Sequence, residues 1–278
     1  MSQLKKQVVL ITGCSTGIGR ALANEFARLG HPTFATARNR NALAGLEDCE
    51  TLQLDVTDRD SIDNAVNEVI DRAGRIDVLV NNAGINVFGP LTEVPIDDVR
   101  QLLETNVTGL LAVTQAVFPF MAKQRRGRIV NIGSVVGIFP TPYTGAYSAT
   151  KSAVHTMSDI LRVEAAPFGI EVVTVQPGGV RSQIGNKGLV GLERYSQETS
   201  FYRKVYDRIV ERANLSQQDP METDQFARKI VKAVMRTNAP RVARAGNGAT
   251  LLPILRWLPS GLIDRILAKR FGLAALND

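Results

Sequence analysis

Residues 8–19 read Val8-Val9-Leu10-Ile11-Thr12-Gly13-Cys14-Ser15-Thr16-Gly17-Ile18-Gly19. The first four are an apolar, β-branched run of strand length, and an apolar helical period that ends near Gly30 follows the glycine-rich turn. This order of strand, glycine turn and helix is typical of a dinucleotide site, because the glycines let the backbone approach a diphosphate at the positive end of the helix. The glycines alone leave an ordinary strand-to-helix turn as the alternative.

Strands and helices alternate over the first 180 residues. Apolar runs of strand length lie at 8–11, 33–37, 51–54, 76–80, 129–132 and 170–175, and a short strand-like stretch follows at 241–243. The pattern predicts the α/β class, a doubly wound, Rossmann-type parallel sheet. We expect a single domain at 1–250 with a C-terminal amphipathic extension at 251–278.

The composition excludes several classes of protein. The 278 residues carry a net charge of +6, but most Lys and Arg residues are scattered, which argues against a nucleic-acid partner. Two cysteines, Cys14 and Cys49, and two histidines, His31 and His155, cannot form a zinc site or a disulfide framework at these spacings. We therefore expect no metal. The N-terminus lacks the pattern of a signal peptide, and these features together predict a cytoplasmic protein.

The ends of the second and third strands carry side chains that suit an adenosine. Arg38 follows the second strand, where an arginine pairs with the 2′-phosphate of NADP and an acidic residue with the 2′-hydroxyl of NAD. Arg38 therefore favours NADP(H), with a surface arginine as the alternative. Asp55 and Val56 stand at the exit of the third strand. The Asp55 carboxylate either accepts a hydrogen bond from the adenine amino group or caps the helix that begins near Thr57.

Tyr147 and Lys151 lie four residues apart in a helical segment and so face the same way. A nearby ammonium favours the phenolate, so Lys151 is expected to lower the phenol pKa from its free value of about 10. Ser134 follows the strand at 129–132 by a loop short enough to bring its hydroxyl to Tyr147. The alternatives are an accidental pair and a turn-forming serine. Asn106, in a helical pattern over 96–123, is either a structural amide or part of the site.

Six motifs stand in one order along the chain: Thr12-Gly13-x-x-x-Gly17-x-Gly19, Asn81-Asn82-Ala83-Gly84, Asn106, Ser134, Tyr147-x-x-x-Lys151 and Pro177-Gly178. This order and spacing over residues 8–182 resembles the short-chain dehydrogenase/reductase family, in its form of about 250 residues.

The resemblance implies a role for each of these residues. Tyr147 would protonate the carbonyl oxygen during reduction, Lys151 would lower the Tyr147 pKa and hold the nicotinamide ribose, and Ser134 would bond the same substrate oxygen. Asn106 would position a water that links Lys151 to solvent. The cofactor-binding residues would be Gly13, Ser15, Thr16, Gly17, Ile18, Gly19, Arg38, Asp55, Val56, Asn82, Ala83, Gly84, Tyr147, Lys151, Pro177, Gly178 and Val180.

The resemblance also suggests where a substrate binds. Residues 181–214 would form a lid, whose interspersed aromatic and aliphatic side chains, Ile184 and Leu189 among them, either suit an apolar ligand or only pack the lid onto the core. The substrate-binding residues would be Ser134, Val136, Phe139, Tyr143 and Tyr147. Gly179-Val180 and the stretch 35–39 are most similar to the branch that acts on steroids, retinoids and acyl-lipid ketones. Ser182 stands where the family often has threonine, which keeps a hydroxyl.

Two segments of the C-terminal extension, 251–259 and 262–271, set Arg and Lys opposite Leu, Ile and Phe. Neither is long enough or apolar enough to span a bilayer. One interpretation is a peripheral contact of residues 251–273 with an anionic membrane. The other, which we favour, is a helix that packs over the pocket or against a partner subunit.

The sequence therefore predicts an NADP(H)-dependent oxidoreductase that transfers a hydride between nicotinamide and a ketone or secondary alcohol of an apolar substrate, which is steroid-, retinoid- or acyl-lipid-like. An NAD-dependent alcohol dehydrogenase or a reductase of small carbonyls is one alternative. A dinucleotide-binding regulator without catalysis is another, although the complete set of Asn106, Ser134, Tyr147 and Lys151 favours an enzyme. The resemblance also implies a homodimer or homotetramer formed through the helices that bear Asn106 and Tyr147.

Overall fold

The computed structural model describes residues 6–182 and 189–276. Its strands are β1 (Val9–Ile11), β2 (Thr33–Ala37), β3 (Glu50–Gln53), β4 (Val78–Asn81), β5 (Gly127–Ile132), β6 (Ile170–Pro177) and β7 (Val242–Ala245). Its α-helices are α1 (Gly17–Arg28), α2 (Arg59–Ala73), α3 (Ile96–Leu103), α4 (Gly109–Gln124), α5 (Gly145–Ala165), α7 (Tyr206–Asn214), α8 (Thr223–Val234), α9 (Leu251–Leu255) and α10 (Ser260–Arg270).

The strands form one parallel sheet in the order β3-β2-β1-β4-β5-β6-β7. The order reverses between β1 and β4, where Ile11 pairs with Ala35 on one side and with Val80 on the other. The expected doubly wound α/β sheet is confirmed, and each predicted strand lies within two residues of an observed one. In such a sheet, ligands bind beyond the carboxyl ends of the strands at the point of reversal.

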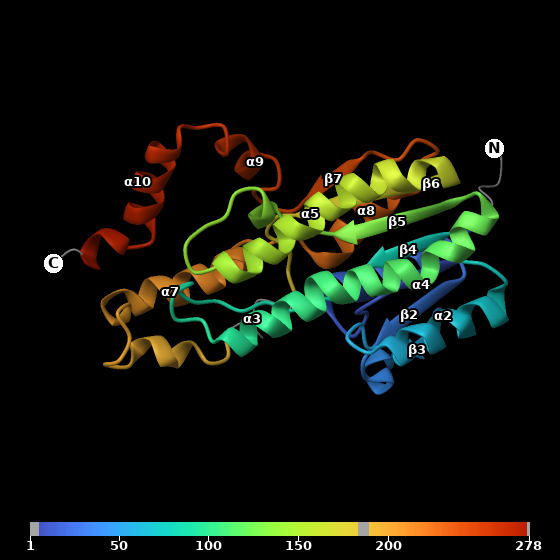
Figure 1. The fold of residues 1–278 in the computed structure, drawn as a ribbon, viewed down its shortest axis with the longest axis horizontal. Helices are drawn as coiled ribbons and strands as arrows, with labels where there is room; N and C mark the ends of the chain where they lie inside the picture. The colour runs from blue at the N-terminus through green and yellow to red at the C-terminus, as the bar shows by residue number, and fades with distance from the viewer. Residues whose placement is uncertain (1–5, 183–188, 277–278) are drawn as a thin grey trace.

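Helices lie on both faces of the sheet (Figure 1). Alternate side chains of the strands pack against one helical layer or the other, as the period of a strand requires. Ile11 packs in a buried cluster with Phe26 of α1 and Phe226 of α8. Leu10, one residue earlier, packs in the opposite cluster with helices α2 and α4, which contribute Val66 and Val117. Both faces are covered by helices, so the strands in the middle of the sheet are largely apolar and buried.

The helical pattern over 96–123 is not one regular helix. A π-helical turn, Glu104–Thr108, separates α3 from α4 and contains Asn106. Inserted π turns are rare and often occur at functional sites. By length and mean hydropathy of 1.2, Ile96–Gln124 would be able to cross a membrane, but Val113, Val117 and Met121 are buried in the core beside the sheet.

A third buried cluster joins the segment predicted to be a lid, 181–214, to the rest of the chain. Tyr195 and Ile209 of the lid pack there with Phe88 and Tyr143, and Phe271 from the end of α10 completes the cluster. Residues 183–188 of the predicted lid, Ile184 included, lie outside the described residues. Figure 1 shows α7 and α10 beyond the arrowheads of the strands, at the opposite end of the molecule from the N-terminus.

Candidate active site

The glycine turn after β1 is fixed against the loop after β4. The Thr12 hydroxyl accepts hydrogen bonds from the backbone N–H groups of Asn82 and Ala83, both at 3.0 Å. Asn82 Nδ2 donates in return to the carbonyls of Thr12 and Gly13, both at 2.9 Å. Gly13 has a φ of +73°, and a methyl group there would stand 2.7 Å from the Ala83 Cα atom. Only glycine fits this contact.

The start of α1 suits an anion. Gly17, with a φ of +59°, turns the chain into the helix, and Thr16 precedes it as the N-cap residue without a side-chain hydrogen bond. The first turn of α1 contains no acidic side chain. Its N–H groups and the positive end of the helix dipole, together with the hydroxyls of Ser15 and Thr16, therefore fit the diphosphate of a dinucleotide.

Arg38 is an exposed residue directly after β2. Within the described part of the chain it makes no ion pair or hydrogen bond, whereas the neighbouring Arg40 donates from Nε to the Thr51 hydroxyl at 3.4 Å. The Arg38 guanidinium is therefore available to a ligand phosphate at the end of the sheet.

Asp55 does not cap α2. Its Oδ1 accepts from the backbone N–H of Thr57 at 3.0 Å and from the Thr57 hydroxyl at 2.8 Å. The cap is Asp58, which accepts from the N–H of Asp60 at 3.1 Å. Val56 is buried in the core cluster of α2 and α4. Two alternative roles were expected for Asp55, and the structure contradicts the prediction that it caps α2.

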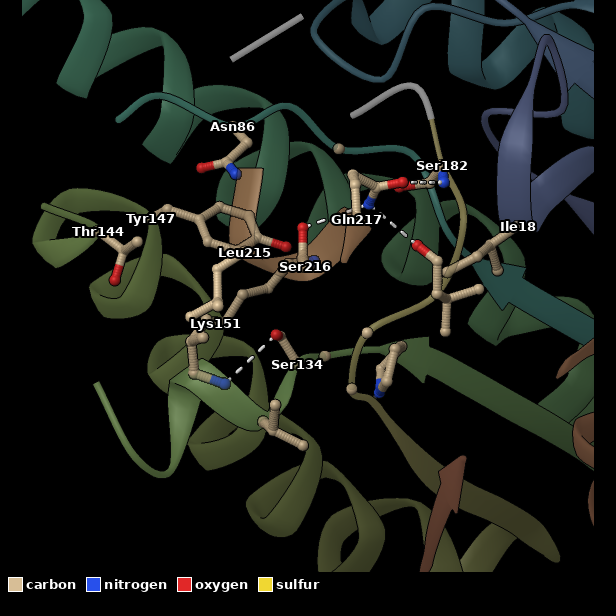
Figure 2. Close-up of a pocket in the computed structure, with 18 of the residues that line it drawn as sticks. Ile18, Asn86, Ser134, Thr144, Tyr147, Lys151, Ser182, Leu215, Ser216 and Gln217 are labelled. Carbon is tan, nitrogen blue, oxygen red and sulfur yellow. Dashed lines mark hydrogen bonds between the residues drawn. The ribbon is translucent and has the colours of Figure 1, made fainter. Parts of the chain in front are cut away.

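Predicted cofactor-binding residues and predicted catalytic residues line one cavity of about 230 Å³ at the carboxyl end of the sheet (Figure 2). The predicted residues in its lining are Ile18, Asn82, Gly84, Ser134, Val136, Tyr147, Lys151, Pro177, Gly178 and Val180. The predicted residues outside the lining are Gly13, Ser15, Thr16, Gly17, Gly19, Arg38, Asp55, Val56, Ala83, Asn106, Phe139 and Tyr143. The structure thus brings together the serine of one motif and the tyrosine and lysine of another.

Burial controls the acid and base properties of Tyr147 and Lys151. Lys151 is 5% exposed, and its ammonium donates to the Ile132 carbonyl at 2.8 Å. Burial lowers the pKa of Lys151 to about 8. Burial also raises the pKa of the Tyr147 phenol to about 12, and the Ser134 hydroxyl and the charge of Arg212 oppose this rise.

The expectation that Lys151 lowers the Tyr147 pKa is therefore corrected. The Lys151 ammonium lies 5.7 Å from the centre of the Tyr147 ring, but it is directed to the Ile132 carbonyl. Desolvation of the phenolate is the largest effect on Tyr147. The phenol consequently keeps its proton at neutral pH.

His155 supports the loop that presents Ser134. Its Nε2 accepts a hydrogen bond from the Ser134 backbone N–H at 3.3 Å, and burial lowers the pKa of the imidazole to about 4. The ring is therefore neutral and able to accept. The Ser134 hydroxyl accepts from the Val136 N–H at 3.3 Å, which sets its direction. Sequence reasoning missed this role, although His155 continues the four-residue spacing of Tyr147 and Lys151 along one helix face.

Asn106 is buried in the π-helical turn and has protein partners at both ends of its amide. Its Oδ1 accepts from the Ile85 N–H at 2.8 Å, and its Nδ2 donates to the Ile85 carbonyl at 3.0 Å and to the Thr150 hydroxyl at 3.1 Å. These bonds join the loop after β4 to α5 at the residue before Lys151.

Phe139 and Tyr143 were expected to line the cavity, but neither residue does so. Tyr143 is buried, and its hydroxyl donates to the Phe271 carbonyl at 2.8 Å, so its ring joins the third cluster. Phe139 is also buried, but it is not among the described residues that line the cavity. The lid aromatics Tyr195 and Tyr206 likewise pack in the third cluster, so these side chains hold the lid on the core.

Comparisons with known proteins agree with this geometry. Residues 7–189 match the family model of the short chain dehydrogenase. The chain is 34% identical over 272 residues to the 3-ketodihydrosphingosine reductase of Bacteroides thetaiotaomicron, which covers 95% of this chain and 97% of that relative. It is 37% identical over 214 residues to the NADPH-dependent 1-acyldihydroxyacetone phosphate reductase of Schizosaccharomyces pombe. That match covers 75% of this chain and 72% of the relative. This chain belongs to the short-chain dehydrogenase family.

A solved short-chain dehydrogenase from Streptomyces avermitilis shares the fold with a TM-score of 0.77 and 31% identity, over 98% of each chain. The family consists of oxidoreductases that act on CH–OH groups with a nicotinamide dinucleotide. The glycine turn, the free N-terminus of α1 and the groove between Ile18 and Pro177 fit such a cofactor.

In this short-chain dehydrogenase, several lining residues had no signal in the sequence. They are Asn86, Phe88, Arg212, Leu215, Gln217 and Leu252. Gln217, in the 3-10 turn after α7, bonds to the chain that leaves β6, because its Nε2 donates to the Val180 carbonyl at 3.2 Å and its Oε1 accepts from the Ser182 N–H at 3.2 Å. These residues reach the cavity from the loop after β4, from α7 and the 3-10 turn that follows it, and from the tail, whose folds periodicity does not predict.

Proposed function

We propose that this protein is an NADP(H)-dependent reductase that converts a ketone in a lipid-like molecule to a secondary alcohol. The observation that best supports this activity is that Ser134, Tyr147 and Lys151 line one cavity whose other walls are largely apolar. Ile85, Phe88 and Leu252 supply part of that apolar wall.

Each of the three side chains has one task in this mechanism. The Ser134 hydroxyl and the Tyr147 phenol bind the carbonyl oxygen, and the phenol gives its proton to that oxygen as negative charge develops. A pKa of about 12 keeps this proton on Tyr147 at neutral pH, which suits reduction more than oxidation. Lys151 would hold the ribose of the cofactor. The cofactor, when bound, supplies the hydride.

The substrate class rests on the cavity and on the relatives. The S. pombe and B. thetaiotaomicron relatives are named as reductases of 1-acyldihydroxyacetone phosphate and 3-ketodihydrosphingosine, which are ketones on long chains. An apolar wall would bury such a chain, and each buried CH₂ contributes about 0.8 kcal/mol. A small polar carbonyl would gain nothing from these contacts.

The reaction is tested first by replacing Tyr147 with phenylalanine. Wild-type protein is expected to consume NADPH with 1-acyldihydroxyacetone phosphate or 3-ketodihydrosphingosine but only slowly with butanone. Tyr147→Phe is expected to lower kcat by about 100- to 10,000-fold, because the proton donor is lost. Tyr206→Phe, a lid tyrosine outside the cavity lining, is the matched control and should keep full activity. Rapid reduction of butanone with no turnover of either lipid ketone would contradict the proposed substrate class.

The cofactor preference is tested by titrating NADPH and NADH against wild type and Arg38→Ala. We expect wild type to bind NADPH more tightly, and Arg38→Ala to weaken NADPH by about 10- to 100-fold while leaving NADH unchanged, since one charged hydrogen-bonding group is lost. Arg100→Ala, which removes an exposed arginine paired with Asp97, is the control. Equal binding of NADH and NADPH by wild type would refute an NADP(H) preference and favour the NAD-dependent alternative.

We also propose a homo-oligomer formed through the faces of α4 and α5. Leu111, Ile160 and Val163 lie exposed there at 38%, 55% and 64%, beside an apolar cavity of about 290 Å³. Light scattering is expected to show a dimer or tetramer, and Ile160→Glu with Val163→Glu should dissociate it. Phe201→Glu, a change at a lid residue that is 88% exposed, should leave the mass unchanged. A monomeric wild type would refute this interface.

The tail, residues 251–276, supports a proposal of peripheral membrane contact. Ile254 and Trp257 are 63% and 89% exposed, and Ile266 is 50% exposed. Basic side chains lie near them in the chain: Arg256 directly follows α9, and Arg265 lies in α10. Apolar side chains beside basic ones are typical of a helix that binds an anionic bilayer surface. The end of the tail is meanwhile held to the lid through buried Phe271 and the cluster around it.

Trp257 reports on this contact because it is the only tryptophan in the chain. Its fluorescence is expected to shift to shorter wavelength with phosphatidylglycerol vesicles and to stay unchanged with phosphatidylcholine vesicles. The double change Ile254→Ser and Ile266→Ser should weaken the response, since apolar burial is lost. An unchanged emission with both vesicle types would leave packing against protein as the role of the tail.

A further inference from the structure

Arg212 is a buried cation on the wall of the cavity. It lies in α7 of the lid, is 6% exposed, and lines the same cavity as Ser134 and Tyr147. Its Nε donates to the Thr141 hydroxyl at 2.7 Å, and its Cζ stands 6.0 Å from the centre of the Phe88 ring. These two contacts fix the guanidinium while leaving its two terminal nitrogens without a hydrogen bond to any described residue.

No carboxylate accompanies this guanidinium in the described part of the chain. Other lid arginines do have acidic partners: Arg194 pairs with Asp98 and Arg208 with Glu211. Around Arg212, the one ionisable neighbour that favours its charge is Tyr147, and burial lowers the pKa of Arg212 to about 10. The stretch 183–188 contains no Asp or Glu in its sequence. A buried guanidinium without an anion is costly, so a bound anion would restore the missing interaction.

A second polar group on the cavity wall also lacks a partner. Asn86 Oδ1 is buried and accepts no hydrogen bond among the described residues. The side chain lines the cavity and is drawn there with Tyr147 in Figure 2. An amide can present either its oxygen or its NH₂ group to a ligand. The polar end of a ligand is therefore expected on this side of the cavity.

We propose that Arg212 binds an anionic group of the substrate, a phosphate or a sulfonate of similar charge and shape, placed close to the reacting carbonyl. This inference rests on the proposed ketone reduction and narrows its substrate class. The guanidinium forms paired hydrogen bonds to two oxygens of such a group. The same charge would repel an ammonium group beside the carbonyl.

The ketones in the names of the two relatives differ in the charge that lies near the carbonyl, so they distinguish an anion site from a site without charge preference. In 1-acyldihydroxyacetone phosphate, a phosphate ester lies one carbon from the carbonyl. In 3-ketodihydrosphingosine, an ammonium group lies at that distance and there is no anion. The matched neutral ketone is 1-acyldihydroxyacetone, which has the same chain without the phosphate. Wild type is expected to reduce the phosphate ketone with a kcat/KM about 10- to 100-fold above that of the neutral ketone.

Arg212→Gln tests whether this preference comes from Arg212. We expect the variant to raise KM for the phosphate ketone by about 10- to 100-fold, with a small change in kcat, and to leave the neutral ketone nearly unchanged. Arg212→Lys should recover part of the preference. NADPH affinity and the unfolding temperature of each variant show that the fold and the cofactor site persist.

A different result would overturn the inference. If Arg212 acts only through Tyr147 or only by packing on Phe88, Arg212→Gln lowers kcat equally for the phosphate ketone and the neutral ketone. Equal kcat/KM values for the two ketones in wild type would likewise refute an anion site.

Binding separates failure of this inference from failure of the proposed reaction. Calorimetry with NADPH-loaded protein compares 1-acylglycerol 3-phosphate, monoacylglycerol and glycerol 3-phosphate, none of which needs turnover. Tight binding of the first compound alone, lost in Arg212→Gln, would support the anion site even if neither ketone were reduced. If glycerol 3-phosphate bound as tightly as 1-acylglycerol 3-phosphate, the anion site would be supported, but a contribution of the lipid chain to binding would be excluded. No difference between 1-acylglycerol 3-phosphate and monoacylglycerol would refute the site.

Discussion

The hydrogen bond from the Lys151 ammonium to the Ile132 carbonyl, at 2.8 Å, joins helix α5 to the end of strand β5. The position of that carbonyl is fixed by the sheet, because Ile132 pairs with Val175 of β6. Ser134 follows Ile132 by two residues, and Tyr147 precedes Lys151 by one helical turn. One buried contact therefore sets the distance between the two hydroxyls that face the cavity. The stripe of α5 that continues to His155 then supports the Ser134 loop from behind.

The parallel sheet adds the second constraint, since it directs every strand's carboxyl end to the same edge. Packing of the apolar faces does not by itself define the loops at that edge. Hydrogen bonds of polar side chains define these loops. Thr12 and Asn82 form hydrogen bonds between the ends of β1 and β4, and Asn106 joins the loop after β4 to α5. The lid is held differently, by an apolar cluster around Tyr143 and Tyr195. The side of the cavity at the glycine turn is therefore held by side-chain hydrogen bonds, and the side at the predicted lid by apolar packing.

This difference explains how far the sequence could predict the molecule. Strands are short apolar runs, and residues that follow them must lie at one edge, so the sheet and the group of Ser134, Tyr147 and Lys151 were predictable. A π-helical turn at Asn106 has nearly the same apolar period as a regular helix. The spacing between Ser134 and Tyr147 places Tyr143 near the site but does not give its direction, and it points to Phe271. Arg212 lies four residues after exposed, paired Arg208, so only tertiary structure distinguishes the two.

The electrostatics of the cavity link catalysis to substrate choice. Lys151 and Arg212 are both buried, and burial lowers the pKa of each, yet both remain protonated at neutral pH because the values are about 8 and about 10. The Tyr147 phenol keeps its proton, since its pKa is about 12. The cavity is therefore positive before a ligand enters, and in the proposed reduction this charge would stabilise the negative charge that develops on the carbonyl oxygen. The same positive field favours ligands that carry an anion and opposes those that carry a cation. The proposed reduction and the proposed anion site therefore depend on the same positive charges, those of Lys151 and Arg212.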